Sequence, residues 1–251
     1  MRPIIKLRGV VKKFGNLTVL KGIDLDIYEG KITTIMGLSG SGKSVTMKLI
    51  LGLLEPDEGE IYYYDRKISR IPFSERKEIL KKFGVVFQNS ALFDSLTLFE
   101  NVAFPLREHY NLTEEEIERR VTHVLELVGL KGAEEKYPSE LSGGMRKRGG
   151  LARALVTEPE VMLYDEPTTG LDPVTGRVIE DLIVDLYMKY GHTALTINHD
   201  VQSTMRMSDY IAFLYDGRIE FFGTPEEAFK SKSIYLKQFL EGRAEGPIKV
   251  V

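Results

Sequence analysis

One glycine-rich stretch constrains the fold more than any other, and it reads Gly37-Leu38-Ser39-Gly40-Ser41-Gly42-Lys43-Ser44. It matches the pattern G-x-x-x-x-G-K-[ST] at every fixed position, between a β-branched run at residues 31–36 and a helical pattern at residues 45–54. Glycine backbones can approach an anion closely, and the N–H groups that open a helix favour negative charge. The stretch therefore predicts a loop that binds a nucleoside triphosphate.

Two side chains of this loop have predicted roles. Lys43 is expected to reach the β- and γ-phosphates, and the Ser44 hydroxyl is expected to coordinate Mg²⁺. Which reaction follows must be decided by other parts of the chain.

The composition excludes several classes of protein. The 251 residues are 43% hydrophobic and 28% charged, which is typical of globular proteins, and a net charge of −3 offers no basic field for nucleic acid. No apolar run approaches the roughly 18 residues of a membrane-spanning helix. Charges within residues 1–8 come too early for a secretory signal, and the absence of cysteine excludes disulfides and thiolate metal sites. We expect the chain to work in the cytosol.

Strand and helix patterns alternate along most of the chain. Strands are predicted at residues 4–11, 23–27, 31–36, 60–64, 84–88, 161–165, 193–198, 211–215 and 218–222. The last two strands are expected to form a hairpin through the two-residue turn Asp216-Gly217. Helices are predicted at residues 45–54, 74–83, from 97, 113–129, 174–190 and from 224, with caps at Ser74, Thr97, Thr113 and Thr224. Pro105 is expected to kink or end the helix that begins after 97, and residues 11–16 are expected to form a turn. The layout is an α/β core interrupted by a helical insertion.

An acidic pair follows the apolar run at residues 161–165. Asp165, at the carboxyl end of a predicted central strand, is placed to hold Mg²⁺ directly or through water. Glu166 can orient an attacking water and accept its proton. The pair predicts hydrolysis of the bound triphosphate.

A second glycine-rich helix start lies at Leu141-Ser142-Gly143-Gly144-Met145 and precedes a basic helix. Ser142 can cap this helix, and Gly143 and Gly144 leave its first N–H groups bare, so that it forms a second anion site. The simplest geometry makes this site serve a nucleotide that another copy of the chain holds. Gly149 and Gly150 inside the same helix each cost about 1 kcal/mol relative to alanine, and no function follows for them from the sequence.

These features, together with three others, resemble the ATP-binding cassette proteins in order and spacing over nearly the whole chain. The set consists of the phosphate-binding loop, Gln88, the Leu-Ser-Gly-Gly motif, Asp165-Glu166, Gly170-Leu171-Asp172 and His199. The resemblance implies a P-loop NTPase (RecA-like) α/β core with an antiparallel β subdomain and an inserted α-helical subdomain. The expected boundaries are 1–88 and 159–225 for the core with its β subdomain, 89–158 for the helical subdomain, and 226–251 for a C-terminal helix and extension.

The same resemblance implies residue roles. Gln88 would be the Q-loop ligand of Mg²⁺ or water that also senses a membrane partner, and Glu166 would be the catalytic base. His199 would contact the γ-phosphate, Asp172 would lie at a dimer contact, and Phe14 would stack on adenine. ATP and Mg²⁺ are the implied ligands.

Three stretches are similar to the ATPases of Mla/Mce-type lipid transport systems. They are the segment from Asn89 to Glu108, the methionine at 145 in place of a common glutamine, and the tail from Phe239 to Pro247, which in that family embraces the neighbouring ATPase subunit. The resemblance implies a homodimeric ATPase on the cytoplasmic face of the inner membrane, bound to a permease and through it to an Mce-type substrate-binding protein.

Other functions remain open from the sequence. An ATPase of a small-solute importer is the main alternative. A cassette protein of DNA repair or translation is disfavoured because the chain has neither tandem cassettes nor a long coiled-coil insertion. A GTPase or small-molecule kinase is disfavoured because no Asn-Lys-x-Asp motif is present.

Overall fold

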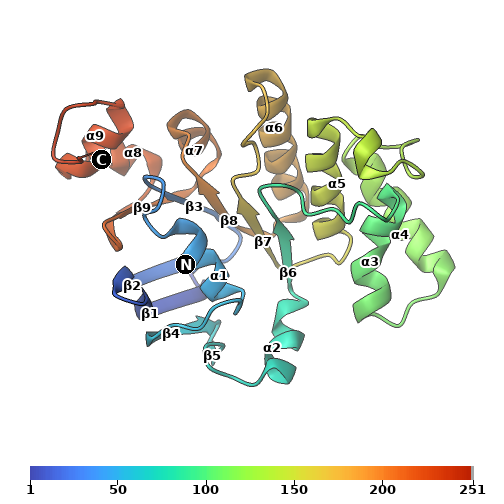
Figure 1. Cartoon of the computed structure of the whole chain (residues 1–251), viewed down its shortest axis with the longest axis horizontal. Helices are drawn as coiled ribbons and strands as arrows, with labels where there is room; N and C mark the ends of the chain where they lie inside the picture. Colours follow the sequence, from blue (N-terminus) through green and yellow to red (C-terminus); the bar gives the residue numbers. More distant parts are fainter. Residues whose placement is uncertain (250–251) are drawn as a thin grey trace. The chain divides into compact units, whose positions relative to one another are not determined.

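The computed structural model describes residues 1–249, which divide into two compact units (Figure 1). Unit 1 comprises Met1–Lys77 and the chain from Thr193 onward, and unit 2 comprises Glu78–His192. The helix α2 (Phe73–Leu80) crosses the boundary between them. Within the described residues, no helix is long and apolar enough to cross a membrane.

Unit 1 contains an antiparallel sheet with the strand order β2-β1-β4-β5. Its strands are β1 (Pro3–Phe14), β2 (Leu17–Tyr28), β4 (Glu58–Tyr63) and β5 (Arg66–Lys67). The strand β1 extends to Phe14, which pairs with Leu17, so the hairpin turn consists of Gly15 and Asn16. The wider turn predicted at residues 11–16 is wrong, because antiparallel pairing continues up to the two-residue turn.

Unit 1 also carries parallel strands next to its phosphate-binding loop. The strand β3 (Ile32–Met36) pairs in parallel with β8 (Thr193–Asn198) and with β9 (Tyr210–Tyr215), and β9 forms an antiparallel hairpin with β10 (Arg218–Gly223). Every residue of β3 and β8 is buried, as expected of strands covered on both faces. The hairpin turn has positive φ at Asp216 and Gly217, which confirms the predicted two-residue connection.

The helices of unit 1 differ from the sequence patterns at both ends of the chain, and the helix α7 was not predicted. They are α1 (Lys43–Ile50), α7 (Val201–Met207), α8 (Pro225–Lys230) and α9 (Ile234–Glu241). The helix α1 ends at Ile50, four residues early, where Gly52 turns the chain at φ 66. The single last helix predicted from Thr224 is two helices, because α9 has its own cap, Ser233.

Unit 2 combines two parallel strands with a group of helices. The strands are β6 (Phe83–Val86) and β7 (Val161–Asp165), and the helices are α3 (Leu98–His109), α4 (Glu114–Leu127), α5 (Gly143–Leu155) and α6 (Pro173–Tyr190), with a short 3₁₀ turn at Pro138–Glu140. Capping boxes at Thr97 and Thr113 are confirmed.

Pro105 does not end its helix, so a kink is the part of that expectation that stays a prediction, and the cap predicted at Ser74 is wrong. Pro105 lies inside α3, which continues to His109, because Val102 and Leu106 are fully buried and their packing outweighs the cost of an interior proline, about 3 kcal/mol. Ser74 lies inside α2 and does not cap it, because the Pro72 carbonyl accepts the first N–H groups of that helix.

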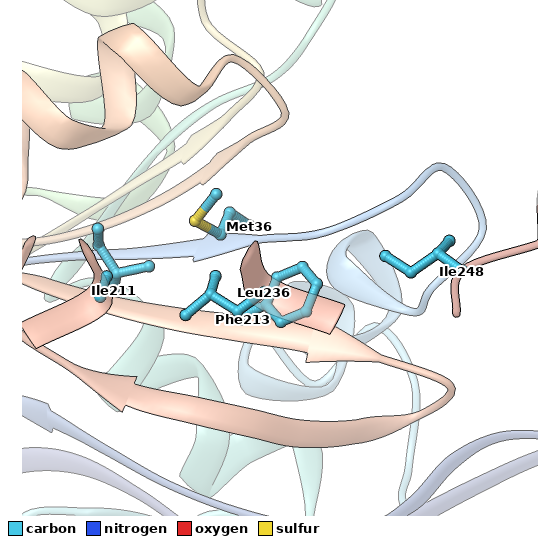
Figure 2. Packing of buried hydrophobic residues seen from close by; sticks show 6 residues of the cluster. Met36, Ile211, Phe213, Leu236 and Ile248 are labelled. Atoms are coloured by element: carbon cyan, nitrogen blue, oxygen red, sulfur yellow. The ribbon is translucent and has the colours of Figure 1, made fainter. Parts of the chain in front are cut away.

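The end of the described chain folds back onto unit 1. Figure 2 shows Ile248 in the buried apolar cluster of Met36, Ile211, Phe213, Ala228 and Leu236. The buried Gln238 amide accepts a hydrogen bond from the Ile248 N–H at 2.7 Å and donates to the Ile248 carbonyl at 3.2 Å. In this single chain, the tail is therefore anchored to its own unit.

Candidate nucleotide-binding and catalytic site

The phosphate-binding loop is the turn from β3 into α1, and its glycines have conformations that other residues rarely adopt. Gly37, Gly40 and Gly42 have φ of 154, 77 and 109. A Cβ on Gly37 would lie 2.2 Å from the Leu214 carbonyl oxygen. Gly42 is the N-cap residue of α1. Within residues 1–249, the start of α1 therefore has no side-chain cap.

Two polar side chains of the loop, those of Lys43 and Ser41, are suited to bind an anion. Lys43 is 6% exposed, and its Nζ donates to the carbonyl oxygens of Gly37 at 2.9 Å and Leu38 at 2.8 Å. The Ser41 Oγ is buried and has no hydrogen-bond partner among residues 1–249. A nearly buried ammonium beside a hydroxyl that has no partner among residues 1–249, in a loop with three glycines, matches the donor pattern that a phosphate group requires.

Two further predicted residues belong to the same unit. Phe14, at the end of β1, is 45% exposed, and the Lys12 ammonium lies 5.5 Å from its ring centroid. His199 is exposed and directly follows β8. The turn that carries it is fixed, because the Asn198 amide donates to Ser203 at 2.9 Å and accepts from the Asp200 N–H at 3.0 Å.

In unit 2, the acidic pair stands where β7 ends. Asp165 is the last residue of the strand, and Glu166 follows it at φ 47, a left-handed conformation that is uncommon outside glycine. The Glu166 carboxylate accepts a hydrogen bond from the Thr169 hydroxyl at 3.0 Å and from the Gln88 amide at 3.4 Å. Residues with a strained backbone conformation and a side chain fixed by hydrogen bonds cluster at functional sites.

Gln88 lies just beyond β6, which ends at Val86, two residues before the predicted end. Its backbone carbonyl accepts a hydrogen bond from the Lys147 ammonium, which is 7% exposed on α5. Burial lowers the pKa of Lys147, and the charges of Glu166 and Asp165 oppose that shift.

The second glycine-rich helix start is the beginning of α5. The Ser142 side chain caps the helix by accepting from the Met145 N–H at 3.2 Å, as predicted. A Cβ on Gly143 would lie 3.4 Å from a Leu171 methyl group, and one on Gly144 would lie 2.8 Å from a Thr175 methyl group. Gly144 therefore allows α5 to approach the start of α6.

Asp172 caps α6. One of its carboxylate oxygens accepts from the Val174 and Thr175 N–H groups, both at 3.0 Å. Hydrogen bonds from Thr175, through its hydroxyl and its N–H, hold the pKa of Asp172 below its usual value. The sequence Asp172-Pro173 is typical of an N-cap followed by the first helical turn, although the helix was predicted only from residue 174.

The predicted site residues thus fall into two sets. Unit 1 carries Phe14, Gly37 to Ser44 and His199, and unit 2 carries Gln88, Ser142 to Gly144, Asp165, Glu166 and Asp172. Within unit 2, the structure brings Gln88 to Glu166. Sequence reasoning missed Thr169 and Lys147, since neither belongs to a fixed motif position and each acts through a partner elsewhere in the chain.

Comparisons with known proteins identify the family of this chain. Residues 20–169 match the family model described as "ABC transporter". The chain is 43% identical over 99% of its length to the "Probable ribonucleotide transport ATP-binding protein mkl" of Mycobacterium leprae, covering 72% of that protein. It is 40% identical over 98% of its length to the "Intermembrane phospholipid transport system ATP-binding protein MlaF" of Haemophilus influenzae, covering 93% of that protein.

A solved structure extends the likeness to three dimensions. It is the dimeric structure of a post-hydrolysis state of an ATP-binding cassette bound to ADP and Pi, with a TM-score of 0.81 and 35% identity, covering 88% of this chain and 98% of the other. Since a family model matches more than half of the chain and full-length relatives share about two fifths of its residues, this protein belongs to the ABC transporter family, as one of its ATPase subunits.

Proposed function

We propose that this chain is the ATPase subunit of a phospholipid transporter of the Mla/Mce type, and that it works as a homodimer beneath a membrane permease. The observation that carries the proposal is the 40% identity to a phospholipid transport ATPase over 93% of that protein, combined with a complete set of nucleotide-site residues. The permease places the chain on the cytoplasmic face of the membrane, and an Mce-type protein binds through the permease.

In the proposed mechanism, the phosphate-binding loop holds ATP. Lys43 exchanges its loop carbonyl acceptors for the β- and γ-phosphate oxygens, and the backbone from Gly37 to Ser44 surrounds them. Phe14 stacks on adenine with its exposed face, and His199 contacts the γ-phosphate.

Mg²⁺ would be held by the Ser44 hydroxyl, the Gln88 amide oxygen and the Asp165 carboxylate. Hard oxygen ligands of this kind suit Mg²⁺, which keeps several waters and relies on substrate phosphates. Among the described residues, no group of three or more His, Cys, Asp or Glu could hold a metal alone. When bound, the ion neutralises charge on the phosphate oxygens.

Glu166 would be the general base. Its carboxylate is oriented by Thr169 and Gln88, so that one oxygen is kept in place to accept a proton from the attacking water. Ser142, Gly143 and Gly144 of a second copy would complete the site at the γ-phosphate, with Asp172 at the dimer contact. ATP then favours the closed dimer, and loss of the γ-phosphate contacts reopens it.

The experiment is the substitution Glu166→Gln, assayed for turnover, ATP retention and dimer formation by size-exclusion chromatography. We expect no turnover, retained ATP and a stable dimer. Glu158→Gln is the matched control, because Glu158 is also a glutamate with left-handed φ in unit 2 and has no proposed role. A Glu166→Gln protein that stays monomeric with ATP, or that turns over normally, would refute the mechanism.

The permease contact is proposed at the segment after Gln88. The rings of Phe93 and Phe104 lie 5.0 Å apart and are 45% and 39% exposed, with Leu92 half-buried beside Phe93 in the sequence. The double substitution Leu92→Asp, Phe93→Asp should abolish co-purification with the permease. Co-purification at the normal yield would place the contact elsewhere.

A small-solute importer is the second candidate, and the relative named for ribonucleotide transport favours it. The two functions differ in what binds the purified complex. Phospholipid should co-purify with the complex and stimulate its ATPase activity if the lipid function is correct. Stimulation by a ribonucleotide other than ATP, without bound lipid, would support the importer.

A further inference from the structure

The helix α5 contacts the chain beyond Gln88 along one continuous face. The contacting positions are Lys147, Gly150 and Arg153, which are spaced three residues apart and so share one side of the helix. We call the contacted stretch, residues 88–97, the Q-loop segment. It is irregular backbone with left-handed φ at Ser90 and Ala91, of 60 and 49.

Cationic side chains of α5 bind the carbonyl groups of this segment. Lys147 donates to Gln88, and Arg153 donates to Ser90 at 2.7 Å and to Ala91 at 2.5 Å. Hydrogen bonds from charged donors are about twice as strong as neutral ones. They offset the strain of two consecutive left-handed residues.

The paired glycines of α5 permit this approach. A Cβ on Gly150 would lie 3.1 Å from the Ser90 carbonyl oxygen, and one on Gly149 would lie 2.8 Å from a Leu98 methyl group. Both distances are shorter than ordinary van der Waals contact. The glycine pair therefore provides the space in which Lys147 and Arg153 reach the backbone of the segment.

The other end of the segment is also held. The fully buried Asn101 side chain accepts from the Phe93 N–H at 2.7 Å and donates to the carbonyl oxygens of Phe93, Leu96 and Thr97 at 2.9 to 3.1 Å. Because both ends of the Q-loop segment are fixed, the position of Gln88 depends on the position of α5. Ser142 caps that same helix.

We propose that Lys147 is a positioning residue for ATP hydrolysis. Its hydrogen bond to the Gln88 carbonyl fixes Gln88 to α5, the helix that begins at the Leu-Ser-Gly-Gly motif. Gln88 and Ser142 therefore change position together. The proposal rests on the proposed roles of Gln88 and Glu166. The Lys147 ammonium donates a hydrogen bond to the Gln88 backbone carbonyl. Its positive charge also interacts electrostatically with the carboxylates of Glu166 and Asp165.

The test compares Lys147→Met with Arg148→Met in the full-length chain. Methionine keeps the length of lysine without a donor. Arg148 is a matched control on the same helix, because it also donates to carbonyl groups, those of Val128 at 3.1 Å and Gly129 at 2.9 Å, which lie away from the Q-loop segment. Both variants lose charged bonds to backbone, but only the first loses the bond to Gln88.

For Lys147→Met we expect kcat to fall by about tenfold to a hundredfold, since small misplacements of positioned groups cost rate on this scale. ATP affinity, measured without Mg²⁺, should change by less than about twofold because Lys43 is untouched. Amide hydrogen exchange of residues 88–93 should become about tenfold faster. Arg148→Met should leave kcat and this exchange unchanged, and Lys147→Arg, which keeps a charged donor, should restore most of both.

Equal kcat losses in Lys147→Met and Arg148→Met, or unchanged kcat and exchange in Lys147→Met, would overturn the proposal. If Lys147→Met does not fold, Lys147→Gln is measured in the same two ways, and normal values there would overturn it equally. Glu166→Gln is assayed beside them. Turnover by that variant would remove the proposed base, whereas the exchange difference between the two methionine variants would still report the Lys147 contact.

Discussion

The two glycine-rich helix starts, at Gly37–Lys43 in unit 1 and at Ser142–Gly144 in unit 2, use glycine for different physical reasons. In the first loop, the glycines have φ between 77 and 154, so the backbone conformation itself requires them. In the second, Gly143 and Gly144 are helical, and Gly144 is needed for the space beside Thr175.

The two starts also differ in how the helix is capped. No side chain caps α1, whereas Ser142 caps α5. In the first loop, the Ser41 hydroxyl has no hydrogen-bond partner among residues 1–249, whereas the Ser142 hydroxyl of the second accepts from the Met145 N–H. Two sequence motifs rich in glycine and serine thus differ in why they need glycine and in how they use the serine hydroxyl.

The largest effect is expected for Gly37→Ala. The new Cβ would meet the Leu214 carbonyl oxygen, which cannot move as a side chain can, so the free energy of unfolding should fall by about 3 kcal/mol or more and ATP binding should be lost. Denaturant unfolding and ATP titration measure both quantities.

Gly40→Ala is the control for the same loop. No atom of residues 1–249 lies within 4 Å of a Cβ at this position, so only the left-handed backbone opposes the change, at about 1–2 kcal/mol. Equal losses in the two variants would show that space is not what distinguishes Gly37.

The serines provide the next test. Ser142→Ala removes the cap of α5 and should lower the free energy of unfolding by about 1 kcal/mol, together with the ATPase rate. Ser41→Ala removes a buried hydroxyl that has no partner among residues 1–249, so stability should not fall although ATP affinity should. A larger stability loss in Ser41→Ala than in Ser142→Ala would reverse the comparison.

A smaller change is expected for Gly144→Ala. Alanine gains about 1 kcal/mol in helix propensity, while its Cβ crowds the Thr175 methyl group at 2.8 Å, so the two effects nearly cancel. Adding Thr175→Ser removes that methyl group and keeps the hydroxyl, and it should raise the free energy of unfolding above that of the single variant. No gain from the second change would mean that space does not explain Gly144.

The smallest effect concerns pH. The pKa of Asp172 is lowered in the folded chain by hydrogen bonds from Thr175, so its contribution to stability is fully present above the unfolded pKa, 3.8, and is lost as pH falls through the lower folded value. Between pH 4 and pH 2, Asp172→Asn should therefore show a weaker decrease in stability than the unchanged chain. Identical acid unfolding curves would contradict this contribution.

Local features were predictable because they depend on neighbours in the sequence. The caps at Thr97, Thr113 and Thr224, the cap at Ser142 and the turn at Asp216-Gly217 each involve residues within four positions of one another. A helix end at Pro105 and a cap at Ser74 are among the predictions that failed, because buried packing in the first case and the Pro72 carbonyl in the second decided the outcome.

By itself, the sequence determined the phosphate-binding loop, the acidic pair and the Leu-Ser-Gly-Gly motif, because each is a fixed pattern over a few residues, and it determined the family through the order of these motifs along the chain. Only the tertiary structure decided what Lys147 and the pair Gly149-Gly150 contact, since Lys147 and the Gln88 carbonyl are 59 positions apart. The physical reason is that the effect of a buried cation, or of a glycine without a Cβ, depends on the groups that folding places in contact with it.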